Sequence, residues 1–203
     1  MTQTTTAKLW LASSSEYRKA ILSKLTKNFN SQAPNVDETV HPHELASTLV
    51  SRLALAKAQA VASSLTEGLV IGSDQVALFQ GAIIGKPHSF DKAIAQLRRF
   101  SGHKVQFLTG LAVVNAADNS IQQHIDYFDV WFRSLTDVEI VRYVEKEQPL
   151  DCAGSFKVEG LGISLFEKLI GDDPNSLVGL PLLKLNHMLI NAGYNVLLED
   201  EPT

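Results

Sequence analysis

Two oppositely charged side chains, Asp74 and Lys86, flank a predicted hairpin in the middle of the chain. The apolar residues 69–72 read as a strand that stops before Asp74, an extended pattern resumes at residues 76–79, and residues 80–81 suit a turn. A strand that ends at an acid and then doubles back would place Asp74 at the mouth of a sheet. A carboxylate and a lysine presented together suit a substrate that carries phosphate and metal. The plainer alternative is an acid in a turn and a solvated lysine, and this stretch alone favours it.

A serine cluster, Ser13 to Ser15, follows a short strand predicted at residues 9–12 and precedes a helix predicted at residues 17–25. Backbone N–H groups at a helix start bind anions, and serine hydroxyls add donors. Arg18 lies in the first turn, where its guanidinium can bind a phosphate through two parallel hydrogen bonds. The pattern is typical of a phosphate cradle, and equally of an N-capping serine beside a surface arginine.

Lys57 stands out within a long helix predicted at residues 42–65. The apolar face of this helix is formed by Leu45, Leu49, Val50, Leu53 and Ala56. The positions three, four and seven residues from Lys57 hold no charged side chain, so the lysine has no partner on its own helix. It therefore either extends along the apolar surface to reach water or projects into a polar cleft and meets a phosphate or a carboxylate.

Two further acids lie in predicted loops. Glu38 follows Asp37 after a loop with a proline, and Glu159 lies in a segment with three glycines in nine residues, which lets the backbone approach a ligand closely. The simpler interpretation is that Glu38 and Glu159 are solvated loop acids. The functional interpretation is that Glu38 is a second ligand of a metal or water and that Glu159 accepts hydrogen bonds from the edge of a base. The glycine spacing does not fit the dinucleotide-binding fingerprint.

Periodic patterns divide the remaining chain into helices and strands. We predict helices that begin after Ser89, at Thr136 and at Pro181, and strands at residues 104–115, 121–133 and 163–170. Phe90, Ile94 and Leu97 are expected on the buried face of the first of these helices. Glu139 follows Thr136 at the spacing of a capping box.

Composition restricts the class of protein. A chain of 203 residues with 45% hydrophobic residues can bury a real core, and no apolar run reaches the length of a membrane span. The first residues lack the apolar centre of a signal peptide, so we expect a cytoplasmic protein. The net charge of -4 argues against a nucleic-acid partner. The single cysteine, Cys152, excludes an intramolecular disulfide and a multi-cysteine zinc site.

Taken together, these segments resemble the Maf family of nucleotide pyrophosphatases. The matching stretches are LASSSEYRKAIL, VDET, LAKAQA, IGSDQV, IIGKP, SGHKVQFLTGLAV, DCAGSFKVEGLGISLF and DDPNSLVGLPL, in the order expected for the family. The resemblance is closest to the branch that hydrolyses 7-methyl-GTP, because Gln75 follows the central Asp and Glu159 lies in the glycine-rich segment. Tyr17 replaces the tryptophan expected in that branch, and its ring can still stack on a cationic methylated purine.

The resemblance implies an α/β fold of the Maf/ITPase-like type, with a curved mixed sheet, flanking helices and two lobes around a deep cleft. We expect one domain over residues 1–203, with a loose tail at residues 1–7 and a frayed end at residues 199–203. A homodimer is one arrangement compatible with it.

The resemblance also implies the chemistry: water attacks between the α- and β-phosphates and releases a nucleoside monophosphate and diphosphate. Asp74 would accept a proton from the water or hold the divalent cation, Mg²⁺ or Mn²⁺, with Glu38 as the second metal ligand. Ser13, Arg18, Lys57 and Lys86 would neutralise the triphosphate, which places Lys57 in the cleft. Tyr17, Gln75 and Glu159 would select the base.

Two alternatives remain. One is a dTTP/UTP pyrophosphatase of the same family, against which Gln75 and Glu159 argue. The other is a nucleotide-binding regulator of septum formation in which catalysis is secondary. The presence of each acid and cation that the hydrolysis needs argues against this second alternative.

Overall fold

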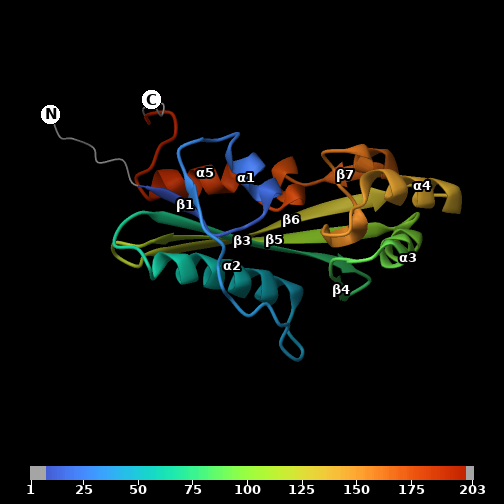
Figure 1. The fold of residues 1–203 in the computed structure, drawn as a ribbon, viewed down its shortest axis with the longest axis horizontal. Coiled ribbons are helices and arrows are strands. Elements are labelled where there is room, and N and C mark those ends of the chain that lie inside the picture. The colour runs from blue at the N-terminus through green and yellow to red at the C-terminus, as the bar shows by residue number, and fades with distance from the viewer. Residues whose placement is uncertain (1–7, 200–203) are drawn as a thin grey trace.

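A seven-stranded mixed sheet forms the centre of the computed structural model, which describes residues 8–199 (Figure 1). The strands are β1 (Leu9–Leu11), β2 (Asn30–Ser31), β3 (Leu69–Phe79), β4 (Ala82–Ile84), β5 (Lys104–Asn115), β6 (Ile121–Phe132) and β7 (Phe166–Ile170). Their order is β2-β1-β3-β5-β6-β7, and β4 also pairs with β3. β1 runs parallel to β2 and β3, and the other pairs are antiparallel. The predicted α/β class with a mixed sheet is confirmed.

Helices cover both faces of this sheet. They are α1 (Glu16–Leu22), α2 (Ala46–Ala62), α3 (Phe90–Phe100), α4 (Asp137–Glu147) and α5 (Leu182–Asn191), with short 3-10 helices η1 (Ala153–Ser155), η2 (Leu161–Leu165) and η3 (Pro174–Val178). Figure 1 shows α2 on one face and α1 and α5 on the other. Among residues 8–199, each helix is too short or too polar to cross a bilayer.

One edge of β3 is interrupted by a notch. On its other edge β3 pairs with β5 from Leu69 to Leu78. On the interrupted edge, β1 pairs only with residues 69–71 and β4 only with residues 77–79. Within the described chain, residues 72–76 therefore have no strand neighbour on this side, and Asp74 lies at the middle of the gap.

Two glycines let α2 lie directly against the sheet. A Cβ atom at Gly72 would overlap the carbonyl oxygen of Ala54, and one at Gly110 would overlap that of Val50. Because strand side chains alternate between faces, Gly72 and Asp74 share the face that α2 covers, and Gly110 is the cross-strand partner of Asp74. The helix thus approaches the sheet most closely around Asp74.

The apolar core of residues 8–199 forms four clusters: two pack α2 against β3 and β5, and the other two lie on either side of the notch. One cluster joins β4, α3 and α4 to the far ends of the long strands, with Phe79, Phe100, Phe107 and Phe132 at its centre. A second joins β1, α1 and α5 and includes Leu11, Leu22, Leu185 and Tyr194. These clusters are the cores of two lobes that share the strands β3 and β5, as the sequence resemblance implied.

Several local predictions are confirmed. The hairpin turns at Gln80 and Gly81, which have φ of 50° and 82°. The Ser89 side chain caps α3, and Thr136 and Glu139 form the capping box of α4.

The predicted break before Asp74 is wrong, because β3 continues from Leu69 to Phe79 and places Asp74 in mid-strand. Each polar side chain of the stretch has a partner there. The Ser73 hydroxyl contacts the carbonyl oxygens of Gly110 and Gly179, Asp74 binds Lys57, and the Gln75 amide binds Thr109.

Other predictions of boundaries and of burial also differ from the structure. α2 begins at Ala46 rather than residue 42, and Leu45 is 70% exposed, because Glu44 bonds to the His41 backbone in a preceding turn. Residues 161–165 form η2, so β7 begins only at Phe166. Phe90 lies at the start of α3 and is 37% exposed rather than buried. The predicted loose tail, and the predicted frayed end beyond residue 199, lie outside the described residues.

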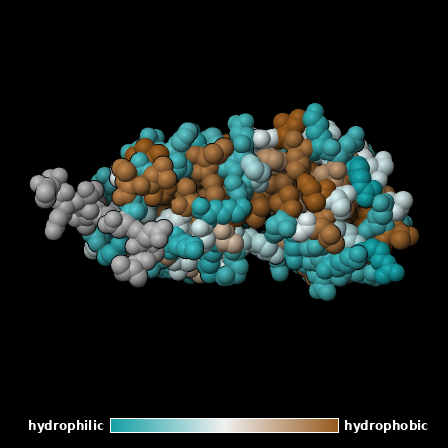
Figure 2. Space-filling model, turned by 90° about the horizontal axis from the view of Figure 1, so that it is seen from above, coloured by the Kyte–Doolittle hydropathy of each residue, from teal (hydrophilic) through white to brown (hydrophobic). Residues whose placement is uncertain are grey.

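Exposed apolar side chains gather on the face that carries α5 and β7. Figure 2 shows brown surface on both halves of this face, and the exposed residues include Leu183 and Ile190 on α5 and Ile163 and Ile170 near β7. The homodimer stays a prediction.

Candidate active site

A buried lysine joins two carboxylates on the α2 side of the sheet. The Nζ atom of Lys57 lies 2.7 Å from Oδ1 of Asp74 and 2.8 Å from Oε1 of Glu38. Lys57 and Asp74 are buried, whereas the Glu38 side chain is 60% exposed. Lys57 therefore does not extend to water along its helix: it binds two acids that come from a strand and a loop.

The loop that carries Glu38 is fixed by an ion pair that the sequence reasoning missed. Arg52 on α2 makes two hydrogen bonds of 2.7 Å to Glu44 and one of 3.1 Å to the carbonyl oxygen of Thr39, the residue after Glu38. The Arg52 guanidinium, together with the backbone N–H of His41, lowers the pKa of Glu44 to about 2. The two residues are eight positions apart, beyond the reach of a helix-spacing pattern.

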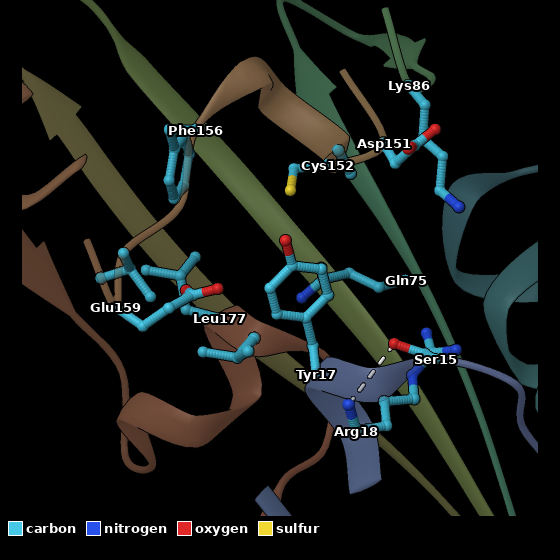
Figure 3. Close-up of a pocket in the computed structure, with 13 residues that line it drawn as sticks. Ser15, Tyr17, Arg18, Gln75, Lys86, Asp151, Cys152, Phe156, Glu159 and Leu177 are labelled. Atoms are coloured by element: carbon cyan, nitrogen blue, oxygen red, sulfur yellow. Dashed lines mark hydrogen bonds between the residues drawn. The ribbon is translucent and has the colours of Figure 1, made fainter. Parts of the chain in front are cut away.

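A cavity of about 120 Å³ lies beside the notch. Five of the predicted site residues line it: Tyr17, Arg18, Gln75, Lys86 and Glu159. They come from α1, β3, the segment after β4 and the loop after η1, so both lobes contribute. Figure 3 shows the Tyr17 ring at the centre of this cavity, with its hydroxyl directed toward the segment of Cys152.

Apolar side chains complete the lining of the cavity. Phe156, Val158, Leu177 and Val178 were not predicted as site residues. They carry no chemical signature in the sequence, and only the fold brings them beside Tyr17. A polar rim with apolar and aromatic walls is typical of a small-molecule site.

Arg18 connects the cavity to the buried carboxylates. Its Nε donates to the carbonyl oxygen of Gly179 at 3.0 Å. Burial lowers the pKa of the Arg18 guanidinium, while the charges of Asp74 and Glu38 raise it. The guanidinium is thus within electrostatic reach of both acids, where it could neutralise an anion between them and the cavity.

The serine cluster shapes the chain between β1 and α1. The Ser15 side chain caps α1 by accepting from the backbone N–H of Arg18, and the Ser13 hydroxyl accepts from the backbone N–H of Ser15. Ser15 lines the cavity, whereas Ser13 is buried and does not line it. The capping interpretation of the cluster is therefore correct, and it leaves the Ser13 hydroxyl hydrogen free to bind an anion.

Glu38 and Asp74 are the residues suited to hold a divalent cation. Their two carboxylates, both bonded to Lys57, supply hard oxygen ligands, and Mg²⁺ typically takes one or two carboxylates together with phosphate oxygens and water. Within residues 8–199, no three acidic, histidine or cysteine side chains gather as a complete metal site. The donor set fits a cation that arrives with its substrate.

Comparison with known proteins shows what this chain is similar to. The family of Maf-like proteins matches residues 8–192. A 7-methyl-GTP pyrophosphatase from Pseudoalteromonas translucida is 52% identical over 93% of this chain and 94% of its own, and one from Pseudomonas aeruginosa is 52% identical over 93% and 98%. A HAM1 protein structure from Coxiella burnetii aligns with 91% of this chain and 99% of its own, with 13% identity and a TM-score of 0.48.

Proposed function

The chain belongs to the Maf family, and we propose that it is a nucleotide pyrophosphatase that hydrolyses 7-methyl-GTP to 7-methyl-GMP and diphosphate. The observation that carries the proposal is the buried Lys57 held between Asp74 and Glu38, next to a cavity lined by Tyr17 and Glu159. The Lys57, Asp74 and Glu38 side chains suit the phosphates, and the cavity with Tyr17 and Glu159 suits a purine base.

In this proposal Asp74 activates the attacking water. The water oxygen bonds to the α-phosphorus, the bond from that phosphorus to the bridging oxygen breaks, and a water proton passes to the Asp74 carboxylate. Lys57 contacts only Oδ1 of Asp74, so Oδ2 is left to accept the proton. A positioned carboxylate acting as a general base typically contributes a factor of about 10² to 10⁴ in rate.

The cationic side chains stabilise the charge that develops on the departing diphosphate. Lys86 is exposed at the rim of the cavity, and Arg18 lies within electrostatic reach of Asp74. Fixed cations aimed at the leaving group stabilise the transition state without reorganisation during the reaction. Glu38 and Asp74 would hold a Mg²⁺ or Mn²⁺ ion, which supplies Lewis-acid chemistry at the phosphate when bound.

In this proposal the cavity selects the base. 7-Methylguanine is cationic, so the Tyr17 ring attracts it by a cation–π interaction and the Glu159 carboxylate attracts it by charge. Uracil carries no such charge. Glu159 therefore favours the methylated purine over the pyrimidine substrates of the alternative assignment.

A substrate panel tests the proposal. Diphosphate release should be fastest from 7-methyl-GTP among 7-methyl-GTP, GTP, UTP and dTTP. Asp74→Asn should lower kcat at least about 10²-fold, because the general base is lost, while binding of the nucleotide persists. Asp91→Asn, an exposed acid at the start of α3, is the matched control and should keep full activity. Faster release from UTP would support the pyrimidine alternative, and turnover that survives in Asp74→Asn would remove Asp74 as the base.

A further inference from the structure

Three polar side chains form one row across the sheet beneath η3. Thr109 on β5 is the cross-strand partner of Gln75 on β3 and of Asp126 on β6. Ser176 in η3 spans the row: its carbonyl oxygen accepts from the Gln75 amide at 2.6 Å and from the Thr109 hydroxyl at 3.0 Å, and its hydroxyl donates to Asp126. Thr109 is 1% exposed, so it does not touch a ligand in the cavity.

This network determines which end of the Gln75 amide is free. The Thr109 hydroxyl hydrogen is used on the Ser176 carbonyl, so the Thr109 oxygen can only accept, and it accepts from Nε2 of Gln75 at 3.0 Å. Both hydrogens of the amide NH₂ group are therefore committed to protein acceptors. In the part of the chain that the structure describes, Oε1 of Gln75 accepts no hydrogen bond from the protein and is accessible to solvent.

We propose that Thr109 is a positioning residue that makes Gln75 a hydrogen-bond acceptor toward the base. The inference rests on the proposed function and specifies how the base is selected. Gln75 and Glu159 line the same cavity, so each can offer an acceptor to a ligand there. The Watson–Crick edge of guanine offers two adjacent donors, N1–H and the exocyclic amino group, whereas adenine offers an acceptor at N1. The cavity therefore favours a base whose Watson–Crick edge carries hydrogen-bond donors.

Binding of monophosphates tests this without requiring turnover. Dissociation constants of GMP and AMP are measured by calorimetry for the wild type, Thr109→Val and Thr109→Ser. The wild type should bind GMP more tightly than AMP. Thr109→Val removes the hydroxyl at nearly constant volume and leaves the Gln75 amide held by the Ser176 carbonyl alone, so the preference should fall about three- to tenfold, the range that one hydrogen bond gives. Thr109→Ser keeps the hydroxyl and should keep the preference.

Three results would overturn the inference: no GMP preference in the wild type, an unchanged preference in folded Thr109→Val, or an equal loss in Thr109→Ser. If Thr109→Val does not fold, Thr109→Ala replaces it. That variant also removes the hydroxyl and should reduce the preference in the same direction, and an unchanged preference there counts against the inference. A wild type that prefers GMP yet does not hydrolyse 7-methyl-GTP would refute the proposed function and leave the role of Thr109 intact.

Discussion

Lys57 contributes to stability differently through each of its two carboxylates. Lys57 and Asp74 are both buried, so each is the main compensation for the charge of the other. The Glu38 side chain is 60% exposed, and water solvates most of its charge. Breaking a buried pair leaves an uncompensated charge in a region of low polarity, whereas breaking an exposed pair does not.

Two substitutions separate these contributions. Lys57→Met should lower the free energy of unfolding by about 3 kcal/mol, because Asp74 would stay buried without its cation. Glu38→Gln should lower it by less than about 1 kcal/mol, because its pair with Lys57 is mostly solvated. Chemical denaturation at neutral pH measures both. Equal losses in the two variants would show that burial does not distinguish the partners of Lys57.

At the scale of elements, α2 and β3 supply both halves of the site. α2 carries Lys57, which binds the Glu38 side chain, and Arg52, which binds the backbone carbonyl of Thr39. β3 alternates its side chains, so Asp74 faces α2 and Gln75 faces η3. In the proposed function, one uninterrupted strand therefore serves the phosphate chemistry on one face and base recognition on the other.

The Arg52–Glu44 pair should affect both activity and acid stability. Because Arg52 lowers the pKa of Glu44 from its ordinary 4.5 to about 2, the ionised form is favoured in the folded state. The resulting stabilisation is fully present above about pH 4.5 and disappears as the pH falls toward 2. Glu44→Gln lacks this contribution, so its stability deficit relative to the wild type should be constant near neutral pH and vanish by about pH 2.

Loss of Glu44 should also loosen the loop that presents Glu38. We expect kcat/KM to fall on the order of tenfold, since small displacements of a catalytic group are costly. Glu145→Gln breaks the exposed pair of Glu145 with Arg142 on α4 and serves as the control. A Glu44→Gln enzyme as active as this control would show that the pair does not position Glu38.

Sequence patterns predicted the elements better than the contacts between them. Caps and turns such as Thr136–Glu139 depend on neighbouring residues, so local spacing revealed them. The continuity of β3 through Asp74 depends on Lys57 and Thr109, which lie far away in the chain, and local pattern suggested a break. The resemblance assigned roles to the candidate site residues, whereas Arg52, Thr109 and Ser176 act through tertiary contacts that no local pattern contains.

At the scale of the whole molecule, the notch lies where two cores meet on a shared sheet. β1 and β4 are too short to cover the edge of β3, and each belongs to a different lobe. The long strands β3 and β5 pass through both lobes, so the walls of the site are joined by continuous backbone hydrogen bonds. This arrangement presents groups from distant segments with little freedom, as proximity-based catalysis requires.

The close approach of α2 to the sheet is what brings Lys57 to Asp74, and Gly72→Ala tests it. The added Cβ would overlap the Ala54 carbonyl, so the helix must shift or the strand must bend. Overpacking of this kind costs about 1–3 kcal/mol, which thermal or chemical denaturation would measure. Because Gly72 and Asp74 share one face two residues apart, the displacement should lengthen the Lys57–Asp74 contact and lower kcat more than it raises KM.

Gly85→Ala, whose Cβ would meet nothing within 4 Å, should leave stability unchanged. A Gly72→Ala protein with wild-type stability and kcat would show that the distance between helix and strand does not control the active site.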